Sequence, residues 1–175
     1  MGQLLHKTHG NPEAVSIEAI SMSFWQLYYH IVTATIDRLP LLTADIEPII
    51  YRLLREKAYN LGGTVYAIGG VEDHVHLVVS IPPRISVASF IGQVKGYASA
   101  QFNRFYTTDF LFQWQSEYGV FSFDKKRLPD VTGYVARQKD HHQQSTLIAL
   151  LERTEEDAKK ISEDGADYLA VDFNE

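Results

Sequence analysis

The chain has 175 residues, of which 45% are hydrophobic and 22% charged, and its formal net charge at pH 7 is −6. These values are typical of a single globular domain, and no apolar stretch approaches the roughly 20 residues that span a bilayer. The absence of cysteine excludes disulfides, thiolate metal sites and cysteine nucleophiles.

Two ends of the chain differ in composition from its middle. Residues 1–23 are polar and irregular and lack the basic start and apolar middle of a signal peptide, so we expect an N-terminal extension of a cytoplasmic protein with no membrane partner. From Glu152 onward, nine acidic residues stand against three basic ones, so this tail carries the whole net charge of −6. We predict a catalytic domain over 24–145, followed by a C-terminal helix and acidic tail over 146–175.

The expected elements alternate between strands and helices. Aromatic and β-branched residues predict strands, apolar spacing of three and four predicts helices, and Thr43 and Ser86 are expected N-caps. In chain order, the expected elements are a strand at 24–35, a helix at 43–61, strands at 64–68 and 74–81, a helix at 86–105, a strand at 112–123 and a helix at 129–144 with a break near 145.

This order, β-α-β-β-α-β followed by a helix, predicts an α+β fold of the ferredoxin-like, split βαβ type. Its four strands form an antiparallel sheet, and both crossover helices pack on one face. Because the first and third strands usually occupy the centre of such a sheet, His74 and His76 should lie on a rigid central element. A rigid strand is a good platform for a metal ion.

The two histidines suggest a metal site because residues i and i+2 of a strand project to the same side, about 6.5–7 Å apart. Asp73, which directly precedes the pair, is a candidate to orient an imidazole or to hold a metal-bound water. Two half-buried imidazoles bonded to the backbone are the alternative interpretation of such a pair. Imidazole and oxygen ligands admit both Mg²⁺ and Mn²⁺.

Tyr134 and Gln138 are four residues apart, so both lie on one face of the expected last helix. Tyr134 is the candidate nucleophile, and a divalent ion would help it by neutralising the charge that develops on a phosphate. Gln138 is the candidate to bring an amide oxygen to the ion. His141 and His142 return to roughly the same face, where they either contact phosphate or help to pack the helix.

Three segments in this order and spacing resemble the single-tyrosine HUH transposases, which mobilise small bacterial insertion sequences as single-stranded DNA, and their repeat-associated relatives. They are Asp73 to His76, Gln113 to Ser122 and Tyr134 to His142. The resemblance covers about residues 24–144. It departs from the family at Val71-Glu72, where a methionine and a proline are common.

The resemblance implies that His74 and His76 are metal ligands, that Gln138 is the third protein ligand and that Tyr134 is the nucleophile. In this family the tyrosine attacks a phosphodiester of single-stranded DNA, and a 5′-phosphotyrosine and a free 3′-hydroxyl result. The expected partners are therefore single-stranded DNA with hairpin-containing ends and a second copy of the chain. In such a homodimer the tyrosine helix of one subunit can serve the histidines of the other, which leaves open where Tyr134 meets its metal site.

Further candidates for supporting the site or contacting DNA are Asp73, Lys95, Arg137, Lys139, His141 and His142. Other readings of the sequence compete with a transposase. A histidine-triad hydrolase would need a further alternating histidine, which Val78 and Ser80 do not supply, and a barrel hydrolase needs roughly 250 residues. A domesticated or inactive nucleic-acid-binding regulator on the same fold is the stronger alternative.

Overall fold

The computed structural model describes residues 24–152, and the expected N-terminal extension and most of the acidic tail lie outside this range. Four strands form one antiparallel sheet in the order β2-β3-β1-β4. The strands are β1 (Tyr28–Ala34), β2 (Thr64–Val71), β3 (His74–Ser80) and β4 (Gly119–Phe123). The helices are α1 (Glu47–Asn60), α2 (Val87–Phe105), α3 (Leu128–Ala136) and α4 (Gln138–Gln144), with short 3-10 turns η1 (Ile36–Arg38), η2 (Lys125–Arg127) and η3 (Ala149–Glu152).

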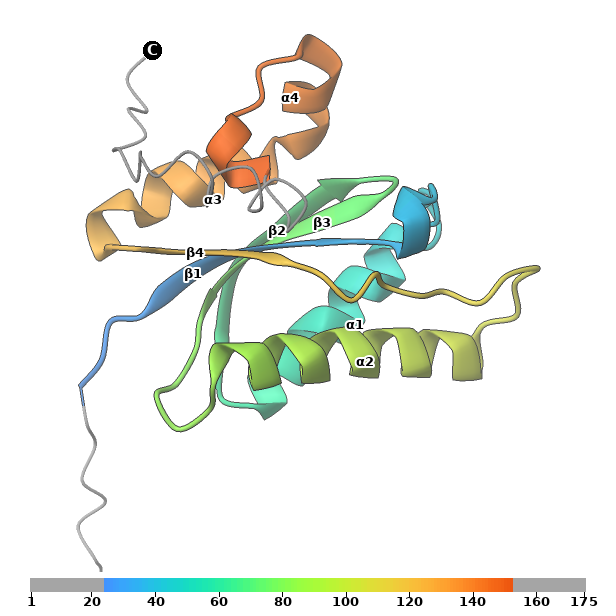
Figure 1. Cartoon of the computed structure of the whole chain (residues 1–175), viewed down its shortest axis with the longest axis horizontal. Coiled ribbons are helices and arrows are strands. Elements are labelled where there is room, and N and C mark those ends of the chain that lie inside the picture. Colours follow the sequence, from blue (N-terminus) through green and yellow to red (C-terminus); the bar gives the residue numbers. More distant parts are fainter. Residues whose placement is uncertain (1–23, 153–175) are drawn as a thin grey trace, which may run out of the picture.

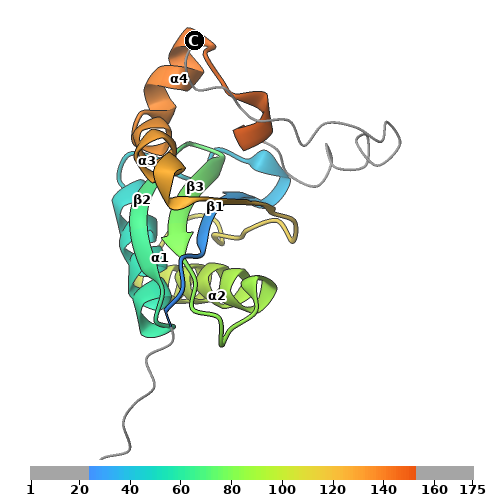
Figure 2. The ribbon, with the colours of Figure 1, turned by 90° about the vertical axis from the view of Figure 1, so that its left-hand side faces the viewer.

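The two faces of the sheet are covered by different helices. The crossover helices α1 and α2 lie on one face, and α3 and α4 lie on the other, as Figures 1 and 2 both show. Strand alternation divides β3 accordingly, because Val75, Leu77 and Val79 enter the core beneath α1 and α2, whereas Val78 packs in a second cluster against α3. His74 and His76 lie on the same face of β3 as Val78 and therefore point toward α3 and α4.

The predicted fold is confirmed, with β1 and β3 in the centre of the sheet and both crossover helices on one face. Ser86 caps α2 as expected, since its side chain accepts a hydrogen bond from the Ser89 backbone. Within the described residues, no helix has both the length and the apolar character needed to cross a membrane.

Several element boundaries differ from the sequence prediction. The strand expected from residue 24 begins at Tyr28, and the one expected over 112–123 is reduced to Gly119–Phe123 plus an isolated bridge between Thr35 and Trp114. Thr43 does not cap α1, because its carbonyl accepts from the Ile46 and Glu47 N–H groups in the turn directly before the helix and Ile46 occupies the N-cap position. The strand propensity of residues 24–27 and 112–118 is thus not matched by a continuous neighbouring strand.

The last helix is broken where the sequence predicted continuity. Arg137 departs from helical geometry with φ −111° and ψ 22°, so that α3 ends and α4 begins on either side of it. Gly69 of β2 allows α3 to lie very close to the sheet, because a Cβ at this position would come within 1.9 Å of the Val135 carbonyl oxygen. The helix that carries Tyr134 is therefore held against the sheet by direct backbone contact.

Candidate active site

Strand β3 presents two imidazoles to the space between the sheet and α4. His74 is 4% exposed and His76 is fully buried. Their rings lie edge to face, with centroids 5.0 Å apart. Because both side chains come from one central strand, their separation is fixed by the backbone, as the sequence predicted.

Each of these rings is oriented by a partner on its Nδ1 atom. Asp73 Oδ1 lies 2.6 Å from His74 Nδ1, and because an ionised carboxylate only accepts, this nitrogen carries the proton. His76 Nδ1 lies 2.9 Å from Nε2 of His30, a fully buried residue of β1 whose ring also stacks on His76. A proton on His76 Nδ1, donated to His30, leaves the Nε2 atoms of both site histidines free to bind an ion.

Helices α3 and α4 bring Tyr134 and Gln138 to the same place despite the break between them. The Tyr134 hydroxyl donates to Glu152 Oε1, and Gln138 Nε2 donates to the same oxygen over 3.2 Å. The backbone N–H of Ile148 in turn donates to the Tyr134 oxygen over 3.1 Å. Tyr134 and Gln138 are both buried, so the two residues converge on one carboxylate.

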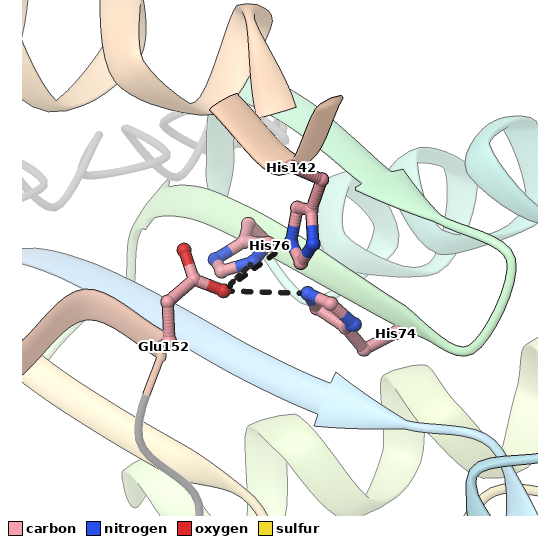
Figure 3. A group of neighbouring side chains, drawn as sticks. All are labelled: His74, His76, His142 and Glu152. Carbon is pink, nitrogen blue, oxygen red and sulfur yellow. Dashed lines mark ion pairs between the residues drawn. The ribbon is translucent and has the colours of Figure 1, made fainter. Parts of the chain in front are cut away.

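The second oxygen of that carboxylate faces three imidazoles. Glu152 Oε2 lies 3.2 Å from His76 Nε2, 3.4 Å from His74 Nε2 and 3.6 Å from His142 Nε2. Figure 3 shows the three rings and the carboxylate pointing toward one another from β3, α4 and η3. The ligand atoms of these four residues all lie within 4.8 Å of one another, so the group could hold a metal ion.

The polar atoms around this point fit a cation. Within residues 24–152, the Nε2 atoms of His74, His76 and His142 and the Oε1 atom of Gln138 are buried without a hydrogen-bond partner. Buried polar atoms are normally satisfied, and three unpartnered imidazole nitrogens around one carboxylate oxygen need an explanation. A divalent ion bound among them would supply it.

Burial and the shared carboxylate set the charge states of the site. Burial raises the pKa of the Tyr134 phenol to about 12, and its hydrogen bond to Glu152 adds to this rise, so the phenol is protonated at neutral pH. Burial alone would also raise the pKa of Glu152, but its interactions with His74 and His76 outweigh burial and hold it far below its ordinary range. The centre of the site is therefore an anionic carboxylate bonded to a neutral phenol.

The two site histidines are shifted in opposite directions. Burial disfavours the charged form of His74, but its hydrogen bond to Asp73 and its interaction with the Glu152 carboxylate outweigh burial and raise its pKa. Burial lowers the pKa of His76, which has no carboxylate on its Nδ1 side. The buried ring beside His30 thus favours the neutral form that an ion requires.

The remaining predicted site residues occupy different places. His141 stacks on the Tyr134 ring at 4.6 Å, and its Nδ1 lies 3.0 Å from Thr146 Oγ1, so it packs against the helix that carries Tyr134. Arg137 is exposed and bonds back to the Gly133 carbonyl. Contact between the exposed Arg137 side chain and DNA stays a prediction.

The two lysines named from the sequence are already engaged. Lys139 is more than half exposed and pairs with Glu47 at 2.5 Å. Lys95 is buried, and its ammonium donates to the backbone carbonyls of residues 115–117 over 2.8–3.2 Å. Burial lowers the pKa of Lys95 to about 8. This placement gives Lys95 a structural role in fixing the segment before β4 and does not support direct contact with DNA.

Comparison with known proteins agrees with this geometry. The family model described as "Transposase IS200 like" matches residues 23–138, about two thirds of the chain. The chain belongs to the IS200-like transposase family. Its curated relatives include the transposases for insertion sequence element IS200 of Salmonella typhimurium and Salmonella typhi, each 28% identical over 82 residues, or 47% of this chain and 54% of the relative. The chain thus spans about half the length of the curated relatives it matches.

Two solved structures share the fold of this IS200-like chain. A putative transposase from Deinococcus radiodurans superimposes with a TM-score of 0.52 at 22% identity, covering 66% of this chain and 93% of the other. A REP-associated tyrosine transposase bound to a REP hairpin superimposes with a TM-score of 0.51 at 14% identity, covering 69% and 74%. Both support the split βαβ sheet as the scaffold of the site.

The sequence of this IS200-like chain does not predict two residues of the site, Glu152 and His30, and it predicts His142 as a supporting, packing or DNA-contacting residue rather than an ion ligand. Glu152 stands at the start of the acidic tail, and His30 lies within the expected first strand. The family match ends at residue 138, before both His142 and Glu152. The sequence signal for His30 is an imidazole in the middle of a strand that is mostly apolar and aromatic.

Proposed function

We propose that this protein cleaves and rejoins single-stranded DNA through a covalent bond to Tyr134, with a divalent metal ion held by His74 and His76. The observation that carries the proposal is that the Tyr134 hydroxyl and the histidine pair of the same chain meet on one carboxylate. A nucleophile, a candidate ion site and a proton acceptor thus lie together. A tyrosine placed only for packing would not need that arrangement.

In the proposed reaction the Tyr134 oxygen attacks a DNA phosphorus, a tyrosine–phosphate bond forms and the bond from phosphorus to the 3′-oxygen breaks. The products are a 5′-phosphotyrosine and a 3′-hydroxyl. That hydroxyl, or another one, reverses the step and rejoins strands without water. When bound, the ion would hold a phosphate oxygen and offset the charge that develops on the phosphate.

The chain's own residues prepare the phenol for this step. Glu152 Oε1 already accepts the phenolic hydrogen bond, so it is placed to receive the proton as the oxygen attacks and, because its own pKa is low, to release it to the departing 3′-oxygen. His141 holds the Tyr134 ring by stacking, and Gln138 holds the carboxylate. The high pKa of the phenol means that proton removal has to be coupled to the attack, because free phenolate is scarce at neutral pH.

Access to Tyr134 requires a rearrangement. The residue is 3% exposed, and Ile148 and Glu152 both bond to its oxygen in the described arrangement. For a phosphate to reach the phenol, the Ile148 N–H therefore has to leave the Tyr134 oxygen, while Leu151 keeps Glu152 in the site. We propose that the Ile148 contact closes the site in the absence of DNA and opens when the strand binds.

The proposed substrate is a single-stranded DNA that carries a hairpin at the element end, acted on in the cytoplasm by a homodimer. The hairpin is supported by the REP-associated relative, whose solved structure is bound to a REP hairpin. The position of Tyr134 beside the histidines of its own chain means that one subunit brings all the proposed groups together. Exchange of the tyrosine helix between subunits is thus not needed to build the site.

The proposal is tested with the full chain, Mn²⁺ or Mg²⁺ and oligonucleotides that carry the DNA flanking the gene. Wild type should form a protein–DNA adduct that survives denaturing electrophoresis, and Tyr134→Phe should form none. Tyr97→Phe is the matched control, because its hydroxyl bonds to Glu56 on α1, away from the site. An adduct of undiminished yield in Tyr134→Phe would show that another residue is the nucleophile.

The alternative function, a non-catalytic nucleic-acid-binding regulator, makes a different prediction. Sheet-based readers of single strands stack bases on aromatic residues of an open sheet face. Here α1 and α2 pack on one face of the sheet and α3 and α4 on the other, so neither face is open along its whole extent. Hairpin binding without an adduct across all flanking sequences would nevertheless favour the regulator over the enzyme.

A further inference from the structure

We propose that His142 and Glu152 complete the ion site as ligands, so that this chain holds its ion with three imidazoles and one carboxylate. Such a set selects a first-row transition-metal ion, Mn²⁺, Co²⁺ or Zn²⁺, over Mg²⁺. The inference rests on the proposed function, in which His74 and His76 bind an ion. It adds the remaining ligands and the class of ion.

The distances from the carboxylate match those between two ligands of one ion. Ligands at about 2.1 Å from a tetrahedral ion lie roughly 3.4 Å apart. Glu152 Oε2 lies 3.2, 3.4 and 3.6 Å from the three imidazole nitrogens. Ordinary N–H···O hydrogen bonds span about 2.7–3.2 Å, so the distances to His74 and His142 exceed that range and the distance to His76 lies at its upper end.

The nitrogens also present the lone pairs that an ion needs. The Nδ1 atoms of His74 and His76 are occupied by Asp73 and His30, so their Nε2 atoms face the carboxylate, and that of His142 faces it too. All three Nε2 atoms are buried, and none has a hydrogen-bond partner within the described residues. Three imidazole nitrogens that converge on one carboxylate oxygen at 3.2–3.6 Å have the arrangement of a ligand set.

Gln138 has a different position from the one the family resemblance implies. Its Nε2 atom donates to Glu152 Oε1, and its own Oε1 is buried without a partner within residues 24–152. Turning the amide so that its oxygen faced the carboxylate would place two acceptors against each other. With Glu152 in place, Gln138 therefore orients a ligand through its N–H group.

The segment that supplies Glu152 is anchored to the domain. Leu151, the preceding residue, is 5% exposed and packs in the cluster of Val78, Val131, Tyr134 and Val135. This anchor fixes η3 beside the sheet and holds the carboxylate over β3. His142 comes from α4, so both added ligands belong to the part of the chain beyond the family match.

The three imidazoles determine which divalent ions this site binds most tightly. Mg²⁺ prefers oxygen ligands and gives up its water reluctantly, whereas imidazole suits transition-metal ions. A site with three nitrogens and one carboxylate oxygen therefore binds Co²⁺ or Zn²⁺ more tightly than Mn²⁺, and Mn²⁺ more tightly than Mg²⁺.

The experiment measures ion binding directly on the full chain, without DNA, by titration calorimetry with Mg²⁺, Mn²⁺ and Zn²⁺ and by the visible absorption of Co²⁺. We expect the Kd for Mn²⁺ to be at least ~100-fold below that for Mg²⁺, and the Co²⁺ spectrum to show nitrogen ligands. Glu152→Gln and His142→Gln should each raise the Kd for Co²⁺ by roughly 10- to 100-fold. Glu56→Gln, an exposed change on α1, is the matched control and should leave it unchanged.

The outcomes separate this inference from the proposed function. If His76→Ala abolishes binding while Glu152→Gln and His142→Gln bind as wild type, the added ligands are wrong and the histidine pair stands. Equal affinity for Mg²⁺ and Mn²⁺ also overturns the inference. If wild type binds none of the ions, the metal-dependent function itself fails. Circular dichroism in chelator shows whether each variant is folded before its affinity is interpreted.

Discussion

Replacing His30 by glutamine removes a buried titratable group from behind the candidate ion site. His30 is fully buried in β1, its Nε2 lies 2.9 Å from His76 Nδ1, and the two rings stack with centroids 5.1 Å apart. Glutamine keeps a polar atom near the same place and removes the ionisation. The substitution therefore tests whether His30 is held neutral in the folded protein.

The magnitude follows from the pKa of His30, which burial, with a smaller contribution from His76, holds well below its ordinary value of 6.5. The unfolded chain takes up a proton at His30 as the pH falls below that value, and the folded chain does not. A histidine with a lowered folded-state pKa thus contributes stability that is present above the unfolded pKa and lost below it. Between pH 7.5 and pH 5.5 the loss is roughly 1.4 kcal/mol for this one group.

The assay is urea unfolding of both proteins at pH 7.5 and pH 5.5 in chelator. Any packing cost of the glutamine is the same at both pH values and cancels in the comparison. Wild type should lose roughly 1.4 kcal/mol more than His30→Gln on acidification. If both proteins lose the same free energy of unfolding, His30 is protonated in the folded state and cannot fix the His76 tautomer as described.

Three other perturbations test the surroundings of the site. Gly69→Ala should lower the free energy of unfolding in urea by at least about 2 kcal/mol and reduce adduct formation, because the new Cβ would meet the Val135 carbonyl at 1.9 Å. Gly96→Ala on α2 is the control and should be neutral or stabilising, because its Cβ meets nothing within 4 Å. Equal effects of the two substitutions would contradict the close approach of α3. Leu151→Ala should weaken Mn²⁺ binding about as much as removal of the Glu152 carboxylate, because it removes the apolar side chain that holds η3 against the domain. An unchanged Kd for Mn²⁺ in calorimetry would show that this packing does not position Glu152. Mn²⁺ at roughly 100 times its Kd should raise the free energy of unfolding by ~2.7 kcal/mol, and chelator should reverse this increase. An unfolding curve that is the same with and without Mn²⁺ would count against a bound metal.

The fold was predictable because its signals are local. Alternation in β3, apolar spacing in α1 and α2 and the Ser86 cap are each contained within one segment. The strand boundaries were less predictable, since Phe24 to Leu27 have strand propensity but no neighbouring strand to pair with. The break at Arg137 carries no local signature, because neither proline nor glycine stands at that position.

The site was predictable where spacing within one element determines it. His74 and His76 share a strand face, and Tyr134 and Gln138 still converge although the helix between them breaks. Glu152 was not predictable, because it is one of nine acidic residues in its segment and only the tertiary packing of Leu151 selects it. His30 likewise acquires its role from the pairing of β1 with β3, which brings it beside His76.

The central claim is that Tyr134 becomes covalently joined to DNA, and mass spectrometry of the adduct tests it most directly. Wild-type protein is incubated with metal ion and a single-stranded element end, digested with protease and nuclease, and its nucleotide-bearing peptide is sequenced. The account predicts a 5′-phosphate linked to the oxygen of Tyr134. A nucleotide found on another residue, or a cleaved strand with no nucleotide on the protein, would contradict it.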